Sequence, residues 1–278
     1  MNNHEPYLRR QAEILTDVLK LLTQDEHVLG IVAVGSYARQ ANDAFSDLDI
    51  GCYLRDDKRT GRQVLYEQVG AVAPLLCQLW IYDVNALYLF ENGVRLDLDF
   101  YRRSDIQKNT WYQRASTALL YDPDGILATS LIFQDEPKAP PHPRWFQPGD
   151  PTLVDWFFWM FRQIVCWTKR SAQGGPDTFH KLSSAIESLA EARATLIVMH
   201  RWALGIPGNL DQIDAACAWR MAQTYPHFTP DEVLACTQRL LDEYEHICPG
   251  YCEKVGLSYP AHKVAVMRQL VQEFEQLD

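Results

Sequence analysis

The sequence has no hydrophobic run long enough to cross a membrane. A transmembrane helix needs about 18 or more consecutive apolar residues, and the most aromatic stretch, which begins at Trp156, follows Asp155 and is interrupted by Arg162. The first residues also lack a basic start followed by an apolar block, the pattern of a secretory signal. We therefore expect a cytoplasmic protein without a membrane partner.

Positive charge is also scarce. Lys and Arg together number 26 and Asp and Glu 36, which gives a net charge of −10, and no basic stripe runs along the chain. Proteins that bind a polynucleotide backbone normally neutralise its phosphates with Lys and Arg. The composition therefore argues against a nucleic-acid partner and favours a small cationic one, attracted by the field of an acidic site.

The cysteines, seven in number and scattered, fit reduced thiols better than a disulfide framework. One cluster has a C-x₃-C spacing within the range of zinc sites; its members are His246, Cys248, Cys252 and His262. Two interpretations stay open: a zinc site, or a turn between two helices at residues 248–252 with buried thiols at its edges. The paired spacing of most zinc sites is missing, which favours the turn.

A short motif near the N-terminus places two acids between apolar runs. The pattern predicts a buried strand at 31–34, a tight turn at 35–36, a helical turn at 37–40 and a second strand from 47. Side chains alternate along a strand, so Asp47 and Asp49 should project from one face while Leu48 and Ile50 point into the core. Adjacent carboxylates repel unless a cation lies between them. Mg²⁺ binds a few carboxylates together with substrate phosphates, so the motif predicts a metal that presents a nucleotide.

These residues resemble the nucleotidyltransferases of the DNA polymerase β-like superfamily. The signature of that superfamily is an apolar strand, Gly-Ser, a spacer and Asp-apolar-Asp-apolar. In this chain Gly35-Ser36 is followed by ten residues and then by Asp47-Leu48-Asp49-Ile50. The closer resemblance is to the aminoglycoside and lincosamide nucleotidyltransferases, in which a helical domain follows the catalytic one.

The resemblance also implies a third acid on a later strand. Relatives carry it in an Arg-apolar-Asp-apolar segment, which matches residues 95–98 and favours Asp97. Asp99 stands where relatives have a small polar residue, so it remains the alternative. The expected roles are two Mg²⁺ ions held by Asp47 and Asp49, with Asp97 or Asp99 completing the metal site and available as a general base for the acceptor hydroxyl.

Four further residues are expected to contact the triphosphate. Gly35 lets the backbone approach the phosphates, and Ser36 offers a hydroxyl and an N–H at a helix start. Arg39 lies one turn along, where it either reaches a phosphate or is an exposed helical arginine. Lys181 is included because the helical domains of relatives sometimes supply such a contact; a surface lysine is the alternative.

The expected reaction is transfer of a nucleoside monophosphate, from ATP or another nucleoside triphosphate, to a hydroxyl group of a small molecule. The resemblance and the acidic charge point to an antibiotic of the aminoglycoside or lincosamide type. Two alternatives stay open: an enzyme that modifies a protein hydroxyl, and a nucleotide-binding regulator without turnover.

The remaining pattern predicts an α+β fold. An amphipathic helix is expected at 6–24, with Leu8 and Ala12 in its apolar stripe, and a second helix at 60–76. Strands follow at 78–83, 86–90 and 94–101, and Asn92-Gly93 joins the last two in a hairpin. A hairpin makes neighbouring strands antiparallel, so the sheet should be mixed and flanked by helices.

A proline-rich connector is expected to divide the chain into two domains. Residues 135–151 hold six prolines and cannot sustain a helix or a central strand, so they separate a catalytic domain, 1–134, from an all-α bundle, 152–278. The bundle helices are predicted at 152–170, 178–204, 210–223, 230–248 and 261–277. The aromatic residues of the first of these, from Trp156 to Trp167, should occupy the bundle centre. Arg193, His200 and Arg201 should form a solvated face.

Overall fold

The computed structural model describes residues 4–55, 59–81, 84–106, 117–131, 149–206 and 215–277. The chain divides into two compact units, residues 1–143 and 144–278, which we call the first and second units. The predicted connector at 135–151 falls largely outside the described residues, as do the predicted strand end at 82–83 and helix start at 210–214.

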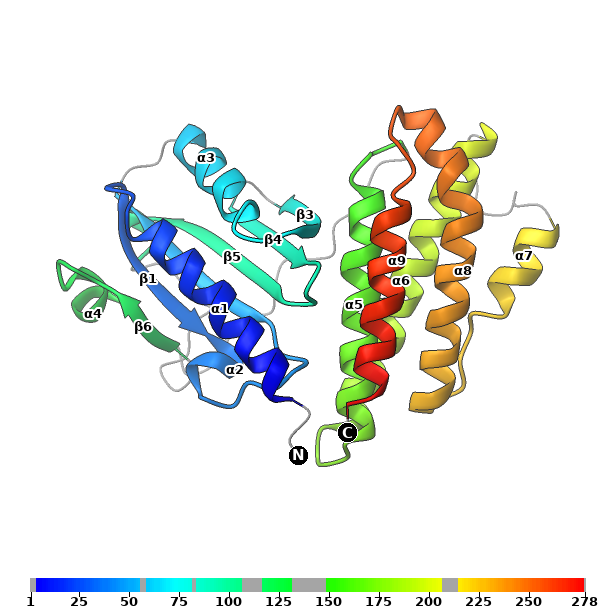
Figure 1. Cartoon of the computed structure of the whole chain (residues 1–278), viewed down its shortest axis with the longest axis horizontal. Helices are drawn as coiled ribbons and strands as arrows, with labels where there is room; N and C mark the ends of the chain where they lie inside the picture. Colours follow the sequence, from blue (N-terminus) through cyan, green and yellow to red (C-terminus); the bar gives the residue numbers. More distant parts are fainter. Residues whose placement is uncertain are drawn as a thin grey trace. The chain divides into compact units, whose positions relative to one another are not determined.

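A six-stranded sheet forms the centre of the first unit, with strand order β3-β4-β5-β2-β1-β6 (Figure 1). The pair β2–β5 is parallel and the other neighbouring pairs are antiparallel, which confirms the mixed sheet of an α+β fold. The strands are β1 Val28–Val34, β2 Leu48–Leu54, β3 Leu75–Ile81, β4 Asn85–Phe90, β5 Arg95–Arg102 and β6 Thr117–Tyr121.

Helices α1 (Glu5–Leu22) and α3 (Arg59–Gly70) cover one face of this sheet. Alternate residues of the strands pack beneath them, among them Leu48 and Ile50 of β2 and Leu96 and Leu98 of β5. A smaller cluster on the other face includes Tyr53 of β2 and Leu127 of the short helix α4 (Ile126–Ser130). Counting only the described residues, the sheet therefore has one deeply covered face and one sparsely covered face.

Two predicted helices of the first unit differ from those observed. The helix predicted to reach residue 76 ends at Gly70, because Pro74 cannot continue a helix and Leu75 already belongs to β3. In α1, Leu8 is only half-buried and Ala12 is exposed. The buried stripe is rotated by one position and consists of Tyr7, Gln11, Ile14, Leu15, Val18 and Leu22.

The second unit is a helical bundle made of α5 (Leu153–Ala172), α6 (Thr178–Leu204), α7 (Ala215–Ala222), α8 (Pro230–Val255) and α9 (Ala261–Glu275). Phe157, Phe158 and Phe161 of α5 are fully buried. Phe157 stacks on Tyr244 of α8 with ring centroids 4.3 Å apart. The expectation that these aromatic residues occupy the bundle centre is confirmed, whereas Trp167 is half-buried. Among the described residues, no helix combines the length and apolar character needed to span a membrane.

The turn predicted at residues 248–252 is wrong, because α8 continues through it. Pro249 lies inside the helix, and the Sγ atoms of Cys248 and Cys252, one helical turn apart, approach to 3.5 Å. His246 and His262 are exposed. Within the described parts of the chain, these four residues do not form a group that could hold a metal ion, so the zinc interpretation is also wrong.

The solvated face predicted on α6 is wrong for its two arginines. Arg193 is 5% exposed. It donates to the hydroxyl and carbonyl oxygens of Thr224 at 2.7 and 2.6 Å, and its guanidinium carbon lies 3.7 Å from the ring centroid of Tyr225. Arg201 is also buried, and His200 is half-buried. Arg193 is part of the packed bundle because Thr224 and Tyr225 accommodate its guanidinium group.

Candidate active site

Three carboxylates meet on the sparsely covered face of the sheet. Asp47 comes immediately before β2, Asp49 is the second residue of β2, and Asp97 is the third residue of β5. Asp49 and Asp97 are direct partners across the parallel pair. One carboxylate oxygen from each of the three acids lies within 4.8 Å of the others. Since the leucines and isoleucine between these acids point into the core, pleating places the three acids on the opposite face.

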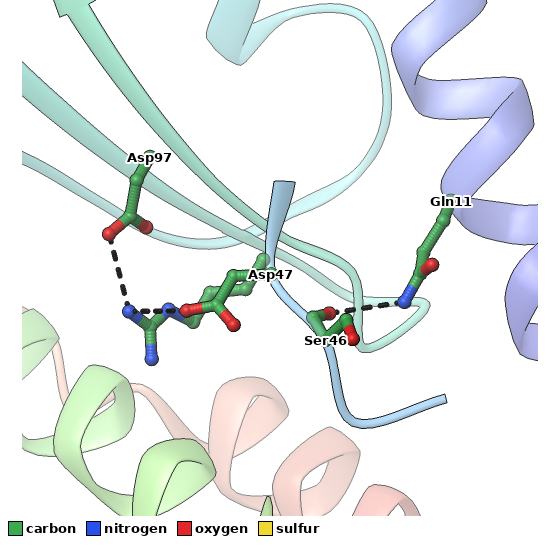
Figure 2. A network of polar contacts seen from close by, with 5 residues as sticks. Gln11, Ser46, Asp47 and Asp97 are labelled. Atoms are coloured by element: carbon green, nitrogen blue, oxygen red, sulfur yellow. Dashed lines mark hydrogen bonds and ion pairs between the residues drawn. The ribbon is translucent and has the colours of Figure 1, made fainter. Parts of the chain in front are cut away.

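Arg95, at the start of β5, provides a positive charge beside these acids. Its Nη2 atom lies 3.0 Å from Asp47 Oδ2 and 3.3 Å from Asp97 Oδ2. Figure 2 draws both contacts, with Asp47 and Asp97 directed toward a single guanidinium nitrogen. Arg95 is 7% exposed, so its charge is poorly screened by solvent. One guanidinium thus offsets part of the charge of three carboxylates.

Burial and mutual repulsion make full ionisation of these acids unfavourable without a further cation. Burial raises the pKa of Asp49 well above its usual value, and the charges of Asp47 and Asp97 raise it further. Burial also raises the pKa of Asp97 to about 6, although Arg95 acts in the opposite direction. A bound cation would reverse this balance, because an opposite charge favours the ionised form of a carboxyl group.

The donor set fits a hard divalent cation such as Mg²⁺. Such ions prefer carboxylate oxygens. Asp97 Oδ1 is buried and has no hydrogen-bond partner, which is costly unless something else coordinates it. A Cβ atom added at Gly35 would lie 2.8 Å from Asp49 Oδ2, so the glycine keeps this oxygen clear. Asp47, Asp49 and Asp97 are therefore the residues that would hold the metal.

Asp99, the alternative third acid, lies outside this group of three. It shares the face of Asp97 on β5, but its carboxylate accepts hydrogen bonds from Asn85 Nδ2 and Tyr101 Oη, both at 2.8 Å. Burial raises the pKa of Asp99, and the two hydrogen bonds oppose that rise. The geometry favours Asp97 over Asp99 as the third acid.

The predicted phosphate contacts occupy different parts of the chain. Gly35 and Ser36 begin the four-residue helix α2 (Gly35–Ala38), directly after β1. Gly35 has a φ of +68°, a conformation that glycine adopts without strain. Arg39 is exposed at the C-terminal end of α2, and Lys181 is half-buried on α6 in the second unit. The roles of Ser36, Arg39 and Lys181 stay predictions.

Sequence reasoning gave no role to two residues, Arg95 in the site and Gln11 outside it. Arg95 was part of the segment that identified Asp97 but had no assigned role; its position two residues before Asp97 places both on one strand face. Gln11 was not noticed at all. It is 2% exposed and contacts the loop before Asp47. The sequence signal that could have identified it is a polar side chain at a position of α1 whose spacing predicts burial.

A mixed sheet with three acids on one face, next to a Gly-Ser turn, is the arrangement expected of a nucleotidyltransferase. The model of the streptomycin adenylyltransferase family matches residues 8–273. The chain therefore belongs to this family and is an enzyme of the nucleotidyltransferase superfamily, close to the antibiotic nucleotidyltransferases. Membership implies a nucleoside triphosphate substrate, a divalent metal and a small-molecule acceptor.

Solved structures resemble the chain only distantly. An aminoglycoside 6-adenyltransferase from Bacillus subtilis is 14% identical, with 96% of this chain and 97% of that chain covered and a TM-score of 0.37. A STING-associated CdnE c-di-GMP synthase from Capnocytophaga granulosa is 11% identical, covering 98% of this chain and 81% of that chain, with a TM-score of 0.31. Structural similarity at this level adds nothing to the family assignment. No curated protein matches the chain.

Proposed function

We propose that this enzyme transfers AMP from ATP to a hydroxyl group of an aminoglycoside of the streptomycin type, with Mg²⁺ at the three carboxylates. The observation that carries the proposal is the group formed by Asp47, Asp49 and Asp97 in a chain that matches the streptomycin adenylyltransferase family over nearly its whole length. ATP is proposed as the donor because that family is named for adenylyl transfer.

Nucleotidyl transfer requires a hydroxyl oxygen to attack the α-phosphorus of the triphosphate in line with the departing pyrophosphate. Bound divalent cations supply charge neutralisation at the attacking and leaving oxygens, and two ions can serve both positions. Asp47 and Asp49 are proposed to hold these ions, and Asp97 to complete the site through its buried Oδ1. A role for Asp97 as the general base stays a prediction.

The triphosphate is proposed to bind beside the three acids, next to Gly35. Gly35 lies next to Asp49, and the absence of a Cβ keeps space open at Asp49 Oδ2. The Ser36 hydroxyl, on the following residue, is proposed to donate a hydrogen bond to a phosphate oxygen. Arg39 and Lys181 are proposed as further phosphate contacts.

A cationic acceptor suits the charge of the protein. The net charge is −10, and a negative field raises the local concentration of a cation before it binds. Streptomycin carries guanidinium groups, whereas a lincosamide carries a single amine, so the charge favours the aminoglycoside. The lincosamide acceptor and the protein-hydroxyl acceptor are the competing outcomes.

The test is an incubation of the purified chain with Mg²⁺, α-labelled ATP and either streptomycin or lincomycin. Pyrophosphate release and label on streptomycin alone would support the proposal. Label on lincomycin or on protein would move the function to the corresponding alternative, and ATP binding without product would indicate a regulator.

Two variants connect the activity with the carboxylates. Asp49→Asn should reduce transfer to background because it removes a proposed metal ligand. Asp124→Asn is the matched control: this acid forms an exposed ion pair with Arg55, which follows the end of β2 opposite to Asp49. Activity retained in Asp49→Asn would refute the metal assignment.

A further inference from the structure

The buried side chain of Gln11 forms hydrogen bonds with the loop at residues 42–46, which leads to Asp47. Gln11 Nε2 donates to the carbonyl oxygens of Asp43 at 2.9 Å and Ser46 at 3.1 Å, and Gln11 Oε1 accepts from Asn42 Nδ2 at 3.1 Å. Gln11 is 2% exposed and lies in the buried stripe of α1. One side chain therefore holds three residues of the loop, the last of which is directly followed by Asp47.

Hydrogen bonds within the loop also stabilise it. Ser46 Oγ accepts from the backbone N–H of Asp43 and donates to Asp43 Oδ1, both at 2.9 Å. Asp43 Oδ1 also accepts from the N–H of Phe45 at 2.9 Å. These bonds tie Asp43, Phe45 and Ser46 to one another, and Gln11 attaches the loop to helix α1.

Gln11 and the carboxylates approach this loop from different sides. Helix α1 packs on the deeply covered face of the sheet, whereas Asp47, Asp49 and Asp97 lie on the other face. In Figure 2, Ser46 stands between Gln11 and Asp47, and the Asp47 side chain points away from Gln11. Gln11 is thus placed to act on the metal site only through the backbone of the loop.

We propose that Gln11 is a positioning residue, which fixes the path of residues 42–46 so that Asp47 leaves the loop directed at the metal. Asp47 is the only one of the three acids that lies outside a strand, so the sheet ladder does not hold it as it holds Asp49 and Asp97. This inference rests on the proposed function, since it assumes that Asp47 binds the metal. Partners that orient metal ligands typically change metal affinity by about 10- to 100-fold when they are removed.

The test is direct Mn²⁺ binding to the full chain, measured by electron paramagnetic resonance of the free ion. Gln11→Met keeps the length of the side chain and removes all three hydrogen bonds. We expect Mn²⁺ to bind roughly tenfold more weakly, and the Mg²⁺ concentration needed for half-maximal transfer to rise by a similar factor. The rate at saturating Mg²⁺ should stay near that of the wild type.

Gln78→Met is the matched control. Gln78 Nε2 also donates to a backbone carbonyl in the first unit, that of Tyr66 at 2.9 Å, but far along the sequence from the metal loop. A purely structural role for Gln11 predicts that both variants lose thermal stability and that neither changes Mn²⁺ affinity. Unchanged Mn²⁺ affinity in a folded Gln11→Met would overturn the proposal.

Two more variants keep the outcome interpretable. If Gln11→Met does not fold, Asn42→Ala removes one of the three bonds; an affinity about threefold weaker would support the proposal, and no change would overturn it. Asp49→Asn should abolish Mn²⁺ binding in the same assay. Binding that survives in Asp49→Asn would show that the proposed function has failed, rather than the role of Gln11.

Discussion

Replacing Arg95 with methionine should destabilise the metal-free protein and make its stability depend strongly on divalent cations. The guanidinium contacts Asp47 and Asp97 at 3.0 and 3.3 Å, and its removal leaves three nearby carboxylates without that charge. Removal of one partner of a buried ion pair costs about 3–5 kcal/mol. The side chains of Asp47 and Asp97 are each about a quarter exposed. Solvent therefore reduces the loss of stability, and we expect a loss of about 3 kcal/mol. The melting temperature should then fall by roughly 9 °C.

The assay is calorimetric unfolding in EDTA and again in excess Mg²⁺. Because a bound cation replaces the missing positive charge, Mg²⁺ should raise the melting temperature of Arg95→Met more than that of the wild type. Arg55→Met is the control: it removes the same charge, but its ion pair with Asp124 is exposed and should be worth at most about 1 kcal/mol. Equal losses in the two variants, or an equal gain from Mg²⁺, would refute this account of Arg95.

Three further predictions concern the same face of the sheet. Gly35 and Gly125 both have a positive φ, +68° and +67°, so replacing either with alanine should cost about 1–2 kcal/mol of stability. Of the two, only at Gly35 would the added Cβ meet a side chain, Asp49 Oδ2 at 2.8 Å. Only Gly35→Ala should therefore lose transfer activity. Asp97→Asn should abolish transfer, whereas Asp99→Asn, whose carboxylate is held by neighbours instead, should retain it within about tenfold; the reverse order in an activity assay would exchange their roles. The pKa of Asp97 is raised from 3.8 to about 6, so between these values the folded metal-free protein keeps a proton that the unfolded chain loses. Its stability should therefore fall by about 2 kcal/mol between pH 4 and pH 6. Urea unfolding in EDTA should show this decline, and Asp97→Asn should reduce it.

The sheet and the acid-bearing strands were predictable because their pattern is local. Alternation around Asp47 and Asp49 requires only that side chains on a strand change face at every residue. The same rule applied to residues 95–99 placed Asp97 and Asp99 together. It could not choose between them, because the choice depends on Asn85 and Tyr101, which satisfy only Asp99.

The missed features depend on partners that are distant in sequence or on solvent. Gln11 contacts backbone carbonyls more than 30 positions away, and a carbonyl group leaves no trace in the sequence. Pro249 was expected to end a helix, yet it lies on an exposed side of α8, where water can satisfy the carbonyl group that loses its helical partner. Arg193 was expected in solvent because its acceptor, Thr224, follows α7 and lies 31 positions away in the sequence.

Parallel pairing of β2 with β5 links the activity of this enzyme to the folding and unfolding of its sheet. The two strands are separated by 40 residues of chain, so their pairing is a long-range contact that forms only at the entropic cost of closing this segment. A slip of one residue would turn the acids into the core and the leucines outward. A chain in which β2 and β5 are unpaired would lack the group of three carboxylates, so we expect activity to appear and vanish together with the pairing of these two strands.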